Sequence, residues 1–145
     1  MEGAELMRRV AAGFAKSDPQ PLLDSIHDQI VWKTATKHEG LFRIDGEYKN
    51  RPGVLDVLSK ISMDYTFHHL RPIEILAGGD VVWGHFDVGL SYDPKGKVGG
   101  VKAINLEMAI RWRLKGGKII EHQGFWDTAS LLIQLGKLDP SSLQP

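Results

Sequence analysis

Apolar residues along this chain follow helical spacing in the first half and alternate with polar residues in the second. In the first half they recur every three or four positions within three segments, which predicts three amphipathic helices. A short apolar run, Ile30–Trp32, separates the second helix from the third and is predicted to be a strand. The predicted helices are residues 4–16, residues 19–26 and a segment from Asn50 to Asp64.

From Tyr65 onward the apolar period becomes two, which predicts four long strands joined by short turns. Because hairpin turns join antiparallel neighbours, the sheet is expected to be mostly antiparallel. Asp127 suits the start of one last helix and Gly136 suits its end. Helices followed by a curved antiparallel sheet define an α+β architecture. The predicted strands are residues 65–77, 80–92, 101–115 and 118–126, and a short strand is also predicted at 41–44.

The turn of the last hairpin decides which of its side chains share a face. A two-residue turn would place Glu121 beside the apolar row that contains Trp112. A three-residue turn instead sets His122 opposite Ile110 and Glu121 opposite Arg111. We expect the three-residue turn, because it joins apolar side chains to one another and places opposite charges across the strands.

The charge balance and the absence of cysteine exclude several classes of function. The 145 residues include 18 Lys and Arg against 18 Asp and Glu, so we expect neither a nucleic-acid nor a membrane partner. Without cysteine, disulfides, thiolate nucleophiles and cysteine-bound zinc are excluded. The first residues contain no continuous apolar run, so we expect no signal peptide and a cytoplasmic location. We expect one domain over residues 1–145, with its core at about 4–136 and a tail at 137–145.

The order of these elements and several short stretches resemble the nuclear transport factor 2-like superfamily, and within it the SnoaL-like and ketosteroid-isomerase-related branch. The resemblance implies a cone-shaped, mostly antiparallel sheet that wraps round the N-terminal helices, as in a cystatin-like α+β barrel, and encloses an apolar pocket. It leaves the chemistry open, because members include isomerases, cyclases, epoxide hydrolases, dehydratases and non-enzymatic binders. The stretches are residues 22–32, 46–54, 79–82, 117–119, 125–127 and 131–136.

The resemblance also suggests which positions carry chemistry. In ketosteroid isomerases the base would stand at Thr34 and the oxyanion-binding acid near Ile110, and neither side chain here can do that work. In limonene epoxide hydrolases an Arg-x-Asp pair corresponds to His85–Asp87, where His replaces Arg. SnoaL-like cyclases use an Asp and a His that face the cavity, and His85, Asp87 and His122 could supply such a set.

His85 and Asp87 are candidate catalytic residues, because side chains two apart on a strand leave the same face about 7 Å apart. In an apolar pocket, a carboxylate and an imidazole shift each other's pKa toward the working pH. With His122, they suggest cofactor-free and metal-free proton transfer beside the carbonyl of an apolar ligand. A non-catalytic binding or dimerisation domain is the alternative. The predicted ligand-binding residues are Trp32, Phe67, His69, Trp83, Leu106, Met108, Ile110, Trp112 and Trp126.

This hypothesis requires strand 80–92 to turn its polar row inward. Its apolar row, Val82 to Leu90, would then lie on the outer face of the sheet, where a second copy of the chain would cover it, so we expect a homodimer. By periodicity alone the apolar row would be buried, and His85 and Asp87 would lie in solvent. The adjacent His68 and His69 should face opposite sides of their strand, and we expect His69 to face the pocket.

Overall fold

The computed structural model describes residues 2–34, 42–94 and 101–145. Helices and strands follow one another in the order that the apolar spacing predicts, with an additional short strand before the third helix. The elements are α1 (Gly3–Ala15), α2 (Gln20–Leu23), β1 (Ile26–Lys33), β2 (Glu47–Lys49), α3 (Asn50–Asp64), β3 (Tyr65–Gly78), β4 (Val81–Tyr92), β5 (Lys102–Lys115), β6 (Lys118–Trp126), α4 (Thr128–Gln134) and the 3-10 helix η1 (Pro140–Leu143).

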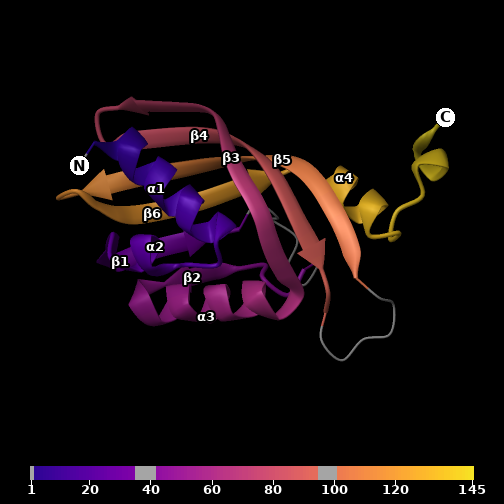
Figure 1. Cartoon of the computed structure of the whole chain (residues 1–145), viewed down its shortest axis with the longest axis horizontal. Helices are drawn as coiled ribbons and strands as arrows, with labels where there is room; N and C mark the ends of the chain where they lie inside the picture. The colour runs from indigo at the N-terminus through magenta and orange to yellow at the C-terminus, as the bar shows by residue number, and fades with distance from the viewer. Residues whose placement is uncertain (1, 35–41, 95–100) are drawn as a thin grey trace.

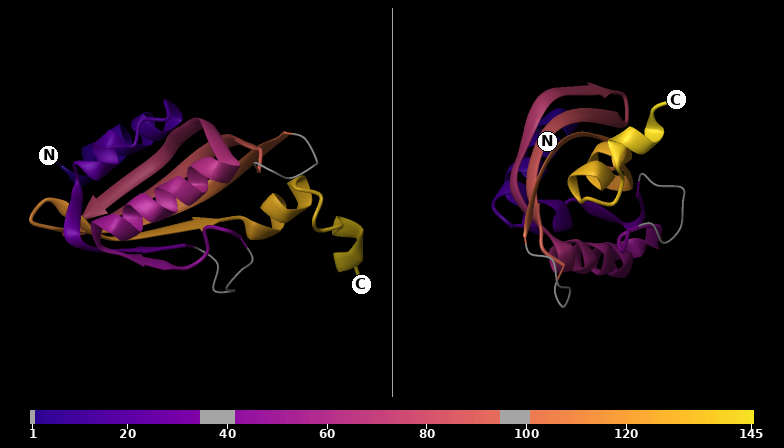
Figure 2. Two further views of the ribbon diagram at one scale, coloured as in Figure 1. Left: turned by 90° about the horizontal axis from the view of Figure 1, so that it is seen from below. Right: turned by 90° about the vertical axis from the view of Figure 1, so that its right-hand side faces the viewer.

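The six strands form one curved, unclosed sheet in the order β2-β1-β6-β5-β4-β3 (Figure 1). Neighbouring strands run antiparallel, except that β1 and β6 are parallel. Figure 2 shows the sheet curving with α4 inside the curve. The predicted α+β architecture with a curved sheet is confirmed. Within the described ranges, no helix is both long and apolar enough to cross a membrane.

Two predicted elements differ from the structure. The helix expected over residues 19–26 is the single turn α2, because Ile26 already belongs to β1. The strand expected at 41–44 is absent from its described part, since residue 41 lies outside the description and the others form a turn. In that turn the backbone N–H of Phe42 donates to the Asp45 carboxylate at 2.7 Å. An Asp side chain that binds the backbone locally competes with strand pairing.

Helix α4 begins and ends as its sequence predicts. The Asp127 carboxylate accepts the backbone N–H of Ser130 at 2.9 Å, and Gly136 adopts a left-handed φ of +73° just after the helix. Gln134 then exchanges two hydrogen bonds with the backbone of Asn105, at 2.8 and 2.7 Å. These contacts fasten α4 to β5, so that Leu131 is buried against the inner side of the sheet.

The expected three-residue turn in the last hairpin is wrong. Gly116 and Gly117 form a two-residue turn with φ of +58° and +76°, as tight hairpins require. A β-bulge at Ile120 then shifts the register, so that His122 pairs with Trp112 and not with Ile110. Because side chains alternate along a strand, this shift by two positions keeps His122 on the expected inner face.

Candidate functional site

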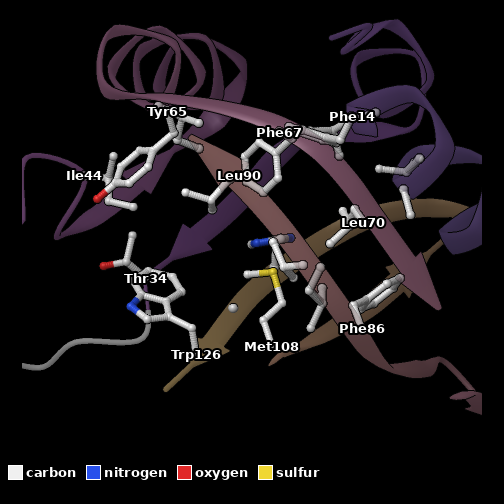
Figure 3. A pocket seen from close by; sticks show the side chains of 18 of the residues that line it. Phe14, Thr34, Ile44, Tyr65, Phe67, Leu70, Phe86, Leu90, Met108 and Trp126 are labelled. Atoms are coloured by element: carbon white, nitrogen blue, oxygen red, sulfur yellow. The ribbon is translucent and has the colours of Figure 1, made fainter. Parts of the chain in front are cut away.

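A cavity of about 120 Å³ lies between the inner face of the sheet and the helices α1, α3 and α4 (Figure 3). Its wall is almost entirely apolar. An apolar protein cavity of roughly 150 Å³ holds one benzene molecule, so this cavity has the scale of a single ring. The predicted ligand-binding residues that line this cavity are Trp32, Phe67, Leu106, Met108, Ile110, Trp112 and Trp126.

The expected inward direction of His85, Asp87 and Trp83 is wrong. Their side chains lie on the outer face of β4, and those of His85 and Asp87 are each 48% exposed. The apolar row, which includes Phe86 and Val88, is buried instead, since burying aliphatic and aromatic surface is favourable while burying ionisable groups is costly. His85 and Asp87 therefore lie outside the cavity that would hold a ligand.

His85 and Asp87 also have separate partners. Nε2 of His85 lies 3.4 Å from the Glu107 carboxylate, and the Asp87 carboxylate lies 3.2 Å from Nε2 of His69. Three of these four side chains, those of His85, Asp87 and Glu107, are 48% exposed or more, a setting in which ion pairs stabilise proteins little. Within the described part of the chain, no three His, Asp or Glu side chains gather in a way that could hold a metal ion.

His69 also faces outward, contrary to expectation. Phe67 and His69 pair with consecutive residues of β4, which leaves His68 as the extra residue of a β-bulge. The bulge places both histidines on the outer face, while Phe67 and Leu70 both line the cavity. The imidazole of His69 covers the backbone of Gly89, where a Cβ atom would collide with it.

The expected homodimer through the outer face stays a prediction, but its basis changes. The apolar row that suggested it is part of the core, with Phe86 and Val88 fully buried. The outer face instead exposes Leu76, Trp83 and Phe125, which are 63%, 43% and 38% exposed. The rings of Trp83 and Phe125 stack with their centroids 6.0 Å apart.

We expect Trp83→Lys to weaken such a dimer by about 30-fold or more in dissociation constant, because central aromatic residues dominate protein interfaces. Light scattering over a concentration series measures this change. Leu143→Lys, at a side chain that is also exposed but lies in η1, is the control. A monomer mass for the wild type at micromolar concentration would contradict the dimer.

His122 brings an imidazole to the cavity wall, and two tryptophans fix its position. Its Nδ1 accepts the indole N–H of Trp112 at 2.9 Å, and its ring stacks on Trp32 with centroids 3.5 Å apart. Because an indole N–H only donates, Nδ1 carries the lone pair and Nε2 carries the proton in the neutral ring. Nε2 lies 3.9 Å from the place that a Cβ on Gly124 would take, and Gly124 also lines the cavity.

The environment keeps His122 neutral. Burial, together with the positive charge of Arg111, lowers the pKa of His122 from 6.5 to about 3. Arg111 itself is held on the outer face by Glu121, at 3.1 Å. With Nδ1 occupied and no positive charge, the imidazole can act as a hydrogen-bond donor at Nε2 but has no free lone pair with which to act as a base.

The polar side chains of Thr34 and Tyr65 line the cavity at one end. Figure 3 shows Thr34, Ile44, Tyr65 and Trp126 at this end, away from Leu70 and Phe86. The Thr34 hydroxyl is already bonded to Gly46, whose N–H it accepts at 3.0 Å and whose carbonyl it approaches at 3.3 Å.

Tyr65 was not among the predicted ligand-binding residues. Burial, reinforced by the negative charges around it, raises the pKa of its phenol, so the hydroxyl stays protonated and can donate. Tyr65 stands two residues before Phe67, and the period of two could have placed both on the inner face.

Comparison with solved structures identifies the fold. No protein-family model matches the sequence, and no curated protein matches it at a significant level. The architecture is nevertheless that of the NTF2-like fold. It is shared with an NTF2-like protein from Burkholderia thailandensis at a TM-score of 0.71 and 20% identity, covering 94% of this chain and 97% of that one.

Two further solved structures are similar to the chain. A proposed isomerase from Rhodopseudomonas palustris superimposes with a TM-score of 0.75 at 18% identity, covering 93% of this chain and 99% of that one. A proposed polyketide cyclase from Xanthomonas campestris pv. campestris has a TM-score of 0.75 at 15% identity, covering 90% and 94%. At such identities the similarity establishes the fold, and the site has to be judged on its own residues.

Proposed function

We propose that this protein binds a small, apolar carbonyl compound in its cavity and polarises the carbonyl oxygen through Nε2–H of His122. The observation that carries the proposal is His122 itself, a neutral imidazole on a mostly apolar wall, whose Nδ1 is already occupied. A donor in apolar surroundings is stabilised when a ligand accepts from it. A carbonyl group on an apolar ring supplies such an acceptor without bringing a charge into the cavity.

A hydrogen bond to the carbonyl oxygen favours one kind of reaction. It stabilises the enolate that forms when a proton leaves the neighbouring carbon, and a neutral imidazole serves as such a donor in another proton-transfer enzyme. No carboxylate of the described residues lines the cavity, so the proton would pass to water or to a second oxygen of the ligand. Cofactor-free isomerisation or cyclisation agrees with this chemistry and with the assignments proposed for two proteins of the same fold.

A non-catalytic binding protein is the second candidate. The observation in its favour is that His122, the imidazole on the wall, has its Nδ1 lone pair committed to Trp112. A cavity that offers donors without a base can hold a carbonyl compound and leave it unchanged. Binding and catalysis are therefore measured separately.

Binding is tested with acetophenone and α-methylstyrene, which have the same shape but differ by an oxygen in place of a CH₂ group. We expect the wild type to bind acetophenone about tenfold more tightly, because one buried hydrogen bond contributes about 1–1.5 kcal/mol. The infrared carbonyl stretch of bound acetophenone should move to lower wavenumber. In His122→Asn, which retains an acceptor for Trp112, both the preference and the infrared shift should be lost.

Catalysis is tested by following exchange of the acetophenone methyl hydrogens in D₂O by proton NMR. The wild type is expected to accelerate this exchange, and His122→Asn is expected to abolish the acceleration. His85→Asn is the matched control, since it makes the same change on the outer face. Binding without faster exchange would support the non-catalytic candidate, whereas equal binding of acetophenone and α-methylstyrene would contradict the proposed function.

A further inference from the structure

One of the indoles that line the cavity has no partner for its N–H. Among the described residues, Nε1 of Trp126 is buried and has no hydrogen-bond partner, whereas the indole N–H of Trp112 is bound by His122. Buried indole N–H groups usually find an acceptor, because an unpaired one gives up the hydrogen bond that water provides in the unfolded chain. Because the described residues provide no acceptor for this N–H, a bound ligand is the remaining source of one.

Packing fixes which way the Trp126 ring points. The Cζ3 corner of its benzene ring lies 3.7 Å from the place that a Cβ on Gly124 would take, the same place that Nε2 of His122 approaches. Phe42 packs edge-on against the indole, with centroids 6.4 Å apart. In an indole, Nε1 lies across the ring system from Cζ3. The N–H of Trp126 therefore points away from His122.

The polar side chains at the end of the cavity beside Trp126 do not bond to its N–H. Figure 3 places Trp126 there together with Thr34 and Tyr65. The Thr34 hydroxyl is bonded to Gly46, and neither this hydroxyl nor the Tyr65 phenol is a hydrogen-bond partner of Nε1 of Trp126. The ring N–H groups of His122 and Trp126, two residues that line the cavity, thus lie apart from one another.

We infer that the ligand carries a second hydrogen-bond acceptor, set across an apolar ring from the carbonyl, and that Nε1–H of Trp126 selects for it. This inference rests on the proposed function, which assigns the carbonyl to His122. The ligand class is single-ring compounds with acceptors at opposite ends, such as para-oxygenated aryl ketones and quinones. A second oxygen on such a ligand also provides a place for a proton that leaves carbon. Trp126 is a specificity-determining residue in this arrangement.

The test uses two matched pairs of ligands, in which the second acceptor stands at two different distances from the carbonyl group. One pair is 4-acetylpyridine with acetophenone, and the other is 4-methoxyacetophenone with 4-ethylacetophenone. For each pair, the ratio of dissociation constants is measured in the wild type and in Trp126→Phe. We expect the variant to weaken the acceptor-bearing member by about fivefold or more relative to its apolar partner in at least one pair. Unchanged ratios in both pairs would overturn the inference.

A second measurement needs no substitution at Trp126. In a ¹H–¹⁵N spectrum of the wild type, the indole N–H resonance of Trp126 should move downfield with the acceptor-bearing ligand and not with its apolar partner. Trp83 is the internal control, because its exposed indole lies on the outer face, and Trp83→Phe should leave all ratios unchanged. An unmoved Trp126 resonance with both acceptor-bearing ligands would contradict the inference.

The two proposals fail in distinguishable ways. If acetophenone shows no preference over α-methylstyrene, the proposed role of His122 fails. If that preference is present and depends on His122, but Trp126→Phe changes neither ratio, only the second acceptor fails. If Trp126→Phe does not fold, the resonance measurement on the wild type decides.

Discussion

His122→Asn should remove much of the acid sensitivity of folding. Burial lowers the pKa of His122 to about 3 in the folded protein, while in the unfolded chain its pKa is close to 6.5. Between these values the unfolded state binds a proton that the folded state does not. The free energy of unfolding therefore falls as the pH decreases from about 6.5 toward 3, and it is unaffected by this group above that range.

His122 by itself makes the free energy of unfolding depend strongly on pH. Each pKa unit corresponds to about 1.4 kcal/mol, so His122 contributes a loss of up to about 1.4 kcal/mol per pH unit between about pH 6 and pH 4. His122→Asn cannot take up the proton, and its curve should be flatter over that window. Urea unfolding at several pH values gives the free energies.

The pH series has a matched control on the other face of the sheet. His85→Asn makes the same substitution at a side chain that is 48% exposed, so an effect of the exchange that does not require burial appears in its curve as well. Equal slopes for His122→Asn and the wild type would show that the folded protein accepts a proton at His122. The assignment of Nδ1 as the acceptor of the Trp112 N–H would then fail in acid, because a protonated ring donates at both nitrogens.

Gly124→Val should block ligand binding while leaving the fold intact. A Cβ at Gly124 would lie 3.7–3.9 Å from Trp126, Met108 and Nε2 of His122, which is ordinary van der Waals contact. The two additional methyl groups of valine then project into a cavity of only about 120 Å³. We expect acetophenone to bind at least about tenfold more weakly, or about 1.4 kcal/mol.

The stability of Gly124→Val should not fall in parallel with binding. Valine is favoured in strands, and replacing glycine reduces the conformational entropy of the unfolded chain. Gly78→Val, at the far end of β3 where a Cβ would meet nothing within 4 Å, is the control for strand propensity. Calorimetric titration and thermal unfolding measure the two effects. Undiminished acetophenone binding by a folded Gly124→Val would place the ligand elsewhere than in this cavity.

Two β-bulges explain why face assignments in the sheet were harder to predict than its strands. Alternation along a strand locates the inner and outer rows only while every residue is paired. The extra residue His68 leaves both His68 and His69 on the outer face, and the extra residue Ile120, after a two-residue turn, returns His122 to the inner face. A bulge has no strong local signal in sequence, because it forms where packing on both sides of the inserted residue is best satisfied.

The outward direction of His85 and Asp87 has a different origin. Alternation along β4 already favoured burial of Phe86 and Val88, and the structure agrees with that pattern. The expectation that His85 and Asp87 face inward came from the resemblance to proteins in which an acid and a histidine face the cavity. On this strand the hydrophobic pattern predicted the face correctly, because burial of the apolar row outweighs any gain from enclosing a polar pair.

The amino-acid pattern by itself determined the helices, the four long strands, the α+β class and the aromatic inner row, since these follow from apolar periodicity and local turn chemistry. Only the tertiary structure decided which imidazole meets the cavity and in what state. His122 becomes a neutral donor because the register of β5 and β6 sets it beside Trp112 and the fold of β1 stacks it on Trp32. Protonation and hydrogen-bond roles depend on neighbours distant in the chain, and no local pattern encodes them.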